Sequence, residues 1–446
     1  MHPRSWVALC SIALGTFACS NSNGGGGGSG GAGGTSGEAG LAGWPVQFGT
    51  ESTYVNGVAT DAQGNVYVAG YAGLVGDAGD EDSSFIAKYE PSGARVWLTE
   101  VDNRDFRAIA RDVTSGSLYV AASGVQVNGH GAAVLIKFDA TGKQVWEQTL
   151  GATVPNLQAG GPAARALTVD SSGDVLIAGV SDVPVPGANP VMVGDGDLML
   201  AKYDASGSVK WVTLLGSTES ATTSGISDYA NAVTTDAQGN AYVAGVLFGT
   251  VGGQVSAGDV DMGVAKFDVD GNNVWVRELG SPVEDEAQGV AVDASGNVYA
   301  AGYTLGDVDG HTSAGDHDLL LVKYDTDGNK QWSQQIGGTL SDVANSVALD
   351  AQSQPVVGGT SYGDFDGHTN QFSNGDTGDL LVLKYDAAGN KLYSTEYGSE
   401  GDDQVSGVAL DSMGNSFVAG STTGALKPLA TGGAFIVRFD ATGKAY

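Results

Sequence analysis

Short runs of apolar and small residues alternate with polar turns along the chain from Trp44 onward. Many of these runs combine β-branched or aromatic residues with Ala and Gly, as in Val66 to Gly70 and Val298 to Gly302. Such runs between turn residues are typical of β-strands. No segment has the apolar spacing of an amphipathic helix of several turns. The pattern therefore predicts an all-β protein with almost no helix.

A turn of the form Asp-x-x-Gly recurs, each time between a run of small residues and a β-rich run. It begins at Asp61, Asp170, Asp236, Asp293 and Asp411, and weaker copies begin at Asp112 and Asp350. A third run then ends in a basic, an aromatic and an acidic residue, and a second Gly turn leads to a fourth run. Seven units of four antiparallel strands predict a seven-bladed β-propeller.

The fourth run carries an aromatic residue seven positions after the acid that ends the third run. These aromatic residues are Trp97, Trp146, Trp211, Trp275, Trp332 and Tyr393. After Asp440 the corresponding position would lie beyond Tyr446, whereas Trp44 begins a matching strand at the other end of the chain. We therefore predict that residues 44–49 complete the last blade, which would remove a free sheet edge.

We expect the first 43 residues to direct the protein to secretion and to tether it to a membrane. Residues 1–18 resemble a secretory signal whose apolar stretch is too short to span a bilayer as a helix. Its end resembles a bacterial lipobox, so we expect residues 1–18 to be a lipoprotein signal peptide and Cys19 to be lipidated; an ordinary signal peptide is the alternative. Residues 19–43 are rich in Gly and Ser and predict a flexible tether. The predicted location is the cell envelope, at the outer membrane, facing the periplasm or the cell surface.

The charge and cysteine content narrow the possible partners. With 51 acidic and 20 basic residues, the net charge of −31 repels phosphate backbones and argues against nucleic acid. Both cysteines precede residue 20, so the propeller has neither a disulfide nor a cysteine metal site. We expect a monomer that touches the membrane only through its lipid anchor.

The repeats resemble the bacterial seven-bladed beta-propeller repeat (SBBP) family from residue 44 to residue 446. The resemblance is best around Asp285–Gly302 and Gly306–Trp332, and it is weakest in the second unit. It implies a propeller at the cell surface and no common catalytic activity. The segment Lys137–Trp146 is also similar to repeats of quinoprotein-type propellers and their related assembly lipoprotein. Those repeats have a very short link between the second and third strands, unlike the long link here from Tyr303 to Asp318.

Two near-duplicate loops offer carboxylates for a cation. Each contains Asp-x-Asp-Gly-His-Thr followed by two further acids, and oxygen ligands of this kind suit Ca²⁺. The candidate calcium ligands are Asp307, Asp309, Asp316, Asp318, Asp364, Asp366, Asp376 and Asp379. The alternative interpretation is that these acids cap turns. We expect no other cofactor.

A second acidic set lies eight residues before the turn Asp in four units, at Asp228, Asp285, Asp342 and Asp403. At the start of inner strands these residues would form an acidic arc at the channel mouth, or each would cap its own turn. Long loops between the second and third strands and between blades would share one face, which we expect to be the binding face.

No motif places a nucleophile beside a base, so an enzyme is the less favoured interpretation. We expect a surface-anchored binding or scaffolding module with a protein or glycan ligand. The alternatives are an enzyme that acts on polysaccharide through loop-face carboxylates and an envelope-assembly propeller.

Overall fold

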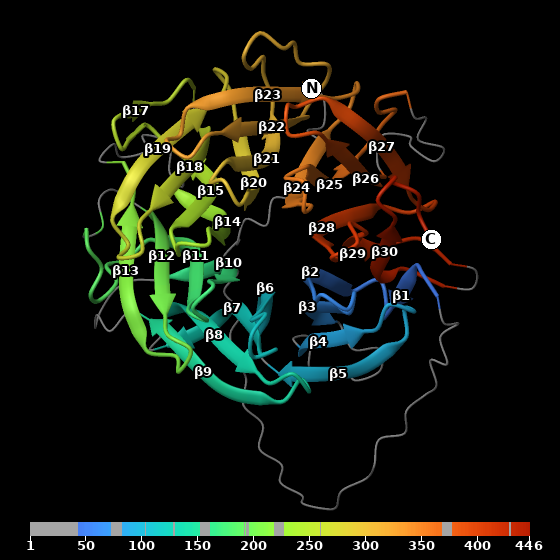
Figure 1. The fold of residues 1–446 in the computed structure, drawn as a ribbon, viewed down its shortest axis with the longest axis horizontal. Helices are drawn as coiled ribbons and strands as arrows, with labels where there is room; N and C mark the ends of the chain where they lie inside the picture. Colours follow the sequence, from blue (N-terminus) through green and yellow to red (C-terminus); the bar gives the residue numbers. More distant parts are fainter. Residues whose placement is uncertain are drawn as a thin grey trace, which may run out of the picture. The chain divides into compact units, whose positions relative to one another are not determined.

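The computed structural model describes residues 43–72, 83–102, 104–127, 130–151, 161–190, 192, 196–217, 227–258, 260–367, 377–427 and 430–446. Residues 42–446 form one compact unit, in which seven four-stranded antiparallel sheets are arranged as blades in a ring (Figure 1). The predicted seven-bladed β-propeller is confirmed. The described residues contain no helix, and hence none that could cross a membrane.

The first four blades follow one another along the chain, each beginning with its innermost strand (Figure 1). Blade 1 comprises β2 (Thr53–Thr60), β3 (Val66–Ala72), β4 (Ser83–Tyr89) and β5 (Arg95–Asp102). Blade 2 comprises β6 (Asp105–Arg111), β7 (Leu118–Val127), β8 (His130–Phe138) and β9 (Gln144–Gly151). Blade 3 comprises β10 (Ala163–Val169), β11 (Val175–Ser181), β12 (Asp197–Tyr203) and β13 (Val209–Leu215). Blade 4 comprises β14 (Tyr229–Thr235), β15 (Ala241–Leu247), β18 (Asp261–Phe267) and β19 (Asn273–Leu279).

The last three blades complete the ring, and a small hairpin interrupts blade 4. Blade 5 comprises β20 (Asp285–Val292), β21 (Val298–Thr304), β22 (Asp318–Tyr324) and β23 (Lys330–Ile336). Blade 6 comprises β24 (Asp342–Leu349), β25 (Pro355–Ser361), β26 (Asp379–Tyr385) and β27 (Lys391–Tyr397). Blade 7 comprises β28 (Asp403–Leu410), β29 (Ser416–Thr422), β30 (Gly433–Phe439) and β1 (Val46–Phe48). The hairpin in blade 4 is formed by β16 (Thr250–Val251) and β17 (Gln254–Val255).

The N-terminal strand closes the ring, as the sequence predicts. Strand β1 runs antiparallel to β30, with Val46 opposite Ile436 and Phe48 opposite Ala434. The Phe48 ring also lies 5.7 Å from the ring of Phe85 in blade 1. The strand therefore joins blade 7 by backbone pairing and contacts blade 1 by side-chain packing.

A hydrogen bond joins the repeated tryptophan to the next blade at four positions: Trp44, Trp211, Trp275 and Trp332. The indole N–H of Trp211 donates to the carbonyl of Val269 (3.0 Å), and that of Trp332 donates to the carbonyl of Ala387 (3.2 Å). Trp44 makes the same bond to Pro91 in blade 1 (2.9 Å). The acceptor lies in the turn between the third and fourth strands of the next blade. A Cβ on Gly271 in such a turn would lie 2.8 Å from the Trp211 ring, so the indole leaves room only for glycine at this turn position.

The core lies between adjacent blades. The middle strands are buried along almost their whole length, as in β12 and β21, whereas the outer strand β5 alternates between exposed and half-buried residues. One apolar cluster joins Leu176 and Leu198 of blade 3 to Val233 and Val243 of blade 4. Since every blade buries its faces against its neighbours, the ring is stabilised by packing around its circumference.

Each innermost strand contains a β-bulge at the same position. A bulge leaves one residue without an opposite partner and redirects its side chain. In all seven blades that residue is polar: Asn56, Arg107, Arg165, Asn231, Gln288, Asn345 and Ser406. The bulges place a ring of polar side chains along the innermost strands, which the sequence analysis did not predict.

Candidate functional site

In each of the two duplicated loops, an aspartate bonds to the outer strand of its own blade. Asp309 pairs with Lys330 and accepts a hydrogen bond from Ser333 (2.6 Å). Asp366 makes the equivalent pair with Lys391 and accepts a hydrogen bond from Ser394 (2.5 Å). Both aspartates have a positive φ, 54° and 52°, which Asp tolerates better than most residues. Their carboxylates therefore bind the outer strands β23 and β27.

The remaining predicted calcium ligands lie in different surroundings. Asp307 accepts a hydrogen bond from the backbone N–H of Ser313 (2.8 Å), and Asp316 and Asp364 are exposed. Asp318 and Asp379 are buried at the starts of β22 and β26. Asp376 and Cys19 lie outside the described residues. No three Asp, Glu, His or Cys side chains within the described ranges form a metal-binding group, and calcium binding stays a prediction.

The four residues predicted to form an acidic arc are buried. Asp228, Asp285, Asp342 and Asp403 are at most 3% exposed. Each accepts a backbone N–H from the turn that precedes its strand, with Ser217 (2.9 Å), Ser281 (2.5 Å), Gly338 (2.5 Å) and Ser399 (2.6 Å) as donors. The structure thus places these carboxyls inside the blade junctions, where they cap turns, and not on an open channel mouth.

Each of these carboxyls lies beside another aspartate, the first residue of the third strand in the preceding blade. The pairs are Asp197 with Asp228, Asp261 with Asp285, Asp318 with Asp342, and Asp379 with Asp403. The glycine after the intervening outer strand leaves room for both. A Cβ on Gly280 would lie 2.3 Å from Asp261 Oδ1 and 2.7 Å from Asp285 Oδ2. The structure thus pairs acids that belong to two separate sets in the repeat pattern.

Burial controls the ionisation of these pairs. Removal from water raises the pKa of Asp228, Asp342, Asp379 and Asp403 to about 6, and a neighbouring carboxylate adds to the rise. Within the described residues, Oδ1 of Asp261 and Oδ1 of Asp318 have no hydrogen-bond partner. Ionisation of both carboxyls in a pair is therefore unfavourable, and near neutral pH a fraction of these carboxyls keeps its proton.

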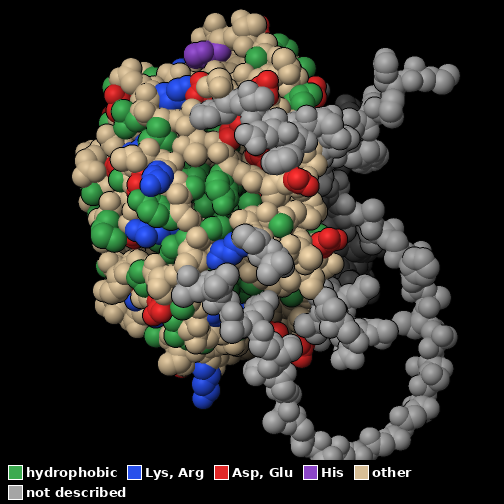
Figure 2. Space-filling view, turned by 90° about the vertical axis from the view of Figure 1, so that its right-hand side faces the viewer, with side chains coloured by type: hydrophobic (Ala, Val, Ile, Leu, Met, Phe, Trp, Pro, Cys, Tyr) green, Lys and Arg blue, Asp and Glu red, His purple; other side chains and the backbone are tan. Residues whose placement is uncertain are grey.

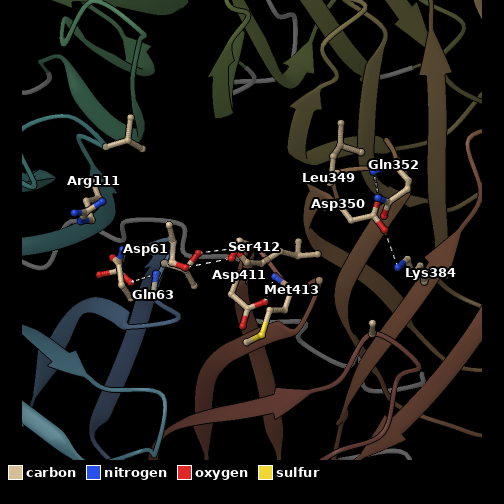
Figure 3. Close-up of a pocket in the computed structure, with 17 residues that line it drawn as sticks. Asp61, Gln63, Arg111, Leu349, Asp350, Gln352, Lys384, Asp411, Ser412 and Met413 are labelled. Atoms are coloured by element: carbon tan, nitrogen blue, oxygen red, sulfur yellow. Dashed lines mark hydrogen bonds and ion pairs between the residues drawn. The ribbon is translucent and has the colours of Figure 1, made fainter.

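A cavity of about 550 Å³ lies on the other face of the ring. It is lined by the short turns between the first and second strands of blades 6, 7, 1 and 2, together with Lys384 and Ala441 (Figure 3). The binding face predicted from the sequence is the opposite one, which carries the long loops. The cavity is formed by turns that hairpin geometry alone explains as structural.

The acids around the cavity are already bound. The carboxylate of Asp61 accepts hydrogen bonds from the backbone of Gln63 and Asn65, the Asn65 amide and the Tyr67 hydroxyl, at 2.8–3.0 Å. Partial burial acts to raise the pKa of Asp61, but these bonds outweigh it and hold the pKa below its ordinary value. Asp411 is held by its turn in the same way, and Asp350 pairs with Lys384 (2.8 Å).

Other lining groups are available to a ligand. The Arg111 guanidinium lies 5.8 Å from the centre of the Tyr67 ring, and among the described residues its Nε has no hydrogen-bond partner. Val113 is 81% exposed and Met413 is 69% exposed, the highest values among the large apolar side chains of the described chain. Arg111 could have been noticed in the sequence, because the equivalent positions hold Thr60, Val169, Thr235, Val292, Leu349 and Leu410.

A polar network lies at the start of the innermost strands of blades 3 to 5. Arg165 donates to Asn231 (2.9 Å), and Asn231 donates to Glu286 (2.7 Å). The Tyr303 hydroxyl lies 2.7 Å from Glu286 and 2.9 Å from Glu284. Glu286 is only 4% exposed. Its carboxylate is thus held inside the protein by several donors, a poor arrangement for attacking a polysaccharide.

The surface seen from the rim carries mixed charge. Figure 2 shows basic, acidic and hydrophobic side chains interspersed on this side of the ring. The exposed apolar residues include Leu392 of the outer strand β27, which is 50% exposed. No single-sign patch on the part visible in this view identifies a nucleic acid or another highly charged ligand.

Comparisons with known proteins agree with the repeat pattern. The SBBP beta-propeller repeat model matches residues 44–73, 210–246, 274–308 and 392–426. The chain is 28% identical to regulatory protein FlaEY of Caulobacter vibrioides over 243 residues, 50% of this chain and 24% of that protein. It is 30% identical to the uncharacterized WD repeat-containing protein L264 of Acanthamoeba polyphaga mimivirus over 109 residues, 23% of this chain and 8% of that protein. The chain therefore spans a quarter or less of the length of these curated relatives.

Solved structures similar to this chain are distant in sequence. BamB from Moraxella catarrhalis is 12% identical with a TM-score of 0.42, and the match covers 89% of this chain and 99% of BamB. Sqt1 from Chaetomium thermophilum is 13% identical with a TM-score of 0.45, and the match covers 89% of this chain and 83% of Sqt1.

Proposed function

Because the chain is a seven-bladed propeller with SBBP-type beta-propeller repeats, we propose that it is a binding module of the bacterial cell envelope and that its ligand occupies the short-turn cavity. One observation carries the proposal: Val113 and Met413, the two most exposed large apolar side chains of the described residues, line the same cavity as Arg111. Exposed apolar groups beside a few polar groups in a concave surface are typical of binding sites.

The rigidity of the surrounding turns supports this use. Each lining turn is closed by its own hydrogen bonds, for example from Gly414 N–H to the Asp411 carbonyl (3.0 Å). Ser412 of blade 7 donates to the carbonyl of Ala62 in blade 1 (3.1 Å). A cavity built from fixed turns loses little conformational entropy when it binds a ligand.

The envelope location is the other part of the proposal. It rests on the signal-like residues 1–18, on Cys19 as the lipid attachment site, and on the Gly-rich tether that follows. A tether would hold the propeller near a membrane and leave both faces accessible. Radiolabelled palmitate incorporation that is lost in Cys19→Ser tests the anchor, and equal labelling of the variant contradicts it.

A cavity-filling variant tests the binding proposal. Ala62→Trp would place an indole in the cavity, and Ala237→Trp is the matched control. Ala237 occupies the same turn position in blade 4 and accepts the equivalent serine bond from Ser171 (3.2 Å), but it does not line the cavity. We expect peptide-library and glycan-array screens of the full chain to find a ligand that binds the wild type and Ala237→Trp but not Ala62→Trp. Equal binding by all three proteins would refute the proposed site.

A further inference from the structure

The two basic side chains that line the cavity differ in whether the protein compensates their charge. Lys384 is 6% exposed and pairs with Asp350, so its charge is compensated within the protein. Arg111 makes no ion pair within the described part of the chain, and its buried Nε lacks a hydrogen-bond partner there. Because this Nε is shielded from solvent, a ligand would contact the guanidinium through its terminal Nη groups. Arg111 is therefore the lining group that an anionic ligand would neutralise.

The acidic side chains that line the cavity do not neutralise Arg111. Asp61 and Asp411 accept hydrogen bonds from their own turns, as described above, and Asp350 is held by Lys384. None of the three forms an ion pair with Arg111 within the described residues, although all line the same cavity. Because a guanidinium presents a planar fork of donors, a carboxylate is the anion that it binds bidentately with the least rearrangement.

Two carboxamides add the hydrogen bonds that a peptide backbone needs. Gln63 and Gln352 line the cavity and are exposed. Within the described residues only their backbone N–H groups are engaged, with Asp61 (3.0 Å) and Asp350 (2.9 Å). Each free carboxamide offers two N–H donors and one carbonyl acceptor, and peptide groups require one of each.

The apolar lining groups suit a side chain next to the carboxylate. Val113 follows Arg111 by two residues, and Met413 lies between Arg111 and Lys384 in the view of Figure 3. Methionine adapts its shape to varied apolar partners. Among the described residues the lining contains no Trp, Tyr, Phe or His, so this part of the chain offers no aromatic surface of the kind on which sugar rings commonly stack.

We propose that the cavity binds the C-terminal end of a polypeptide. The carboxylate lies on Arg111, the last side chain is apolar and packs against Val113 and Met413, and the preceding peptide groups bond to Gln63 and Gln352. A cavity of about 550 Å³ is within the size range of ligand sites of roughly 300–1,000 Å³. This inference rests on the proposed function and names the ligand class of the same site.

Paired peptide probes test the inference on the full chain. The probes are N-acetylated hexapeptide mixtures that end in Val or Leu, prepared with a free carboxylate and with a C-terminal amide. Calorimetry or fluorescence anisotropy should show that the wild type binds the free acid at least tenfold more tightly than the amide. In Arg111→Gln this preference should fall to about one, and Arg111→Lys should retain only part of it because Lys makes no bidentate contact.

The controls separate local from global effects. Lys143→Gln removes one positive charge from an exposed turn residue that does not line the cavity, so it should leave the preference unchanged. Thermal unfolding of Arg111→Gln close to that of the wild type shows that the variant is folded. Met413→Glu should weaken binding of the free acid, because it replaces an apolar contact with a like charge.

Three outcomes would overturn the inference: equal binding of acid and amide, a preference that persists in Arg111→Gln, or no binding of either peptide at millimolar concentration. The proposed function fails separately. If Ala62→Trp abolishes binding of a ligand that is not a peptide acid, the cavity is a binding site and only the inferred ligand class is wrong.

Discussion

Replacing Asp342 with Asn removes one of the buried acids at the junction between blades 5 and 6. Asp342 is 1% exposed and lies beside Asp318, which is also 1% exposed. Burial, and secondarily the neighbouring Asp318 carboxylate, raise the pKa of Asp342 from 3.8 to about 6. A third acid, Glu396 of β27, faces the same junction, and burial together with the neighbouring acids raises its pKa to about 7.

The direction of the effect follows from proton linkage. A carboxyl whose pKa rises on folding binds its proton more tightly in the folded state than in the unfolded state. The stability that it contributes is therefore present at acid pH and is lost as the pH rises through about 6. A rise of roughly two pKa units corresponds to about 3 kcal/mol between pH 4 and pH 8 at 1.36 kcal/mol per unit.

The substitution Asp342→Asn would keep the shape of the side chain and remove its charge. We expect this variant to be more stable than the wild type at pH 8 by about 2 kcal/mol, once about 1 kcal/mol is subtracted for the weaker hydrogen bond from Gly338. At pH 5, about one pH unit above the unfolded pKa, the gain should fall to less than about 1 kcal/mol. For a domain of this size the gain corresponds to a rise in Tm on the order of 2–3 °C.

The assay is thermal unfolding followed by tryptophan fluorescence at pH 5 and pH 8. Asp61→Asn is the control of opposite sign, because hydrogen bonds hold the pKa of Asp61 below its ordinary value. The Asp61 carboxylate stabilises the fold above its unfolded pKa and loses that effect in acid, so its replacement should lower Tm at both pH values. If the Tm difference between Asp342→Asn and the wild type is the same at both pH values, the proton-sharing explanation is wrong.

Further predictions concern closure and packing. Phe48→Ala should lower the unfolding free energy by about 3 kcal/mol, because Phe48 is 8% exposed and joins blade 7 to blade 1; an unchanged denaturant midpoint would contradict closure by β1. Deleting residues 20–40 should leave Tm within about 1 °C of the wild type, because residues 42–446 form a compact unit; a large fall would mean that the tether stabilises the ring. Gly398→Ala should lower the unfolding free energy by about 1–3 kcal/mol, since its Cβ would lie 2.0 Å from Asp379 Oδ1. Gly253 is the control position, because a Cβ there would meet nothing within 4 Å and only the positive φ would oppose the substitution. At higher ionic strength, free-acid peptides should associate faster, because salt screens the repulsion of a chain with net charge −31; stopped-flow rates that fall with salt would contradict this.

The tryptophan positions show how much the sequence determined about the fold. A strand repeat is local, so Trp332 and its counterparts identified the outer strands, and the surplus Trp44 predicted the closing strand that pairs with β30. The partner of each indole is not local. The bond from Trp332 to Ala387 spans 55 residues, and nothing in the repeat indicates that it crosses to the next blade.

The bulged positions show a similar limit. Asn231 occurs within a run of small residues, and the sequence does not indicate that a bulge leaves it unpaired there. Only the antiparallel register with β15 reveals the extra residue between Ala230 and Ala232. The same register brings Asn231 to Glu286 in blade 5, a contact that depends on the order of the blades.

By itself, the sequence determined the all-β class, the seven blades and the strand that closes the ring, because each depends on repeated local patterns. Only the tertiary structure decided which acids meet and where a cavity lies. Asp318 and Asp342 are separated by the whole outer strand β23 and come together through blade packing. The cavity exists because turns from four blades converge on one face. Both features depend on distances between blades, which are set by the packing of the whole ring and not by any single repeat.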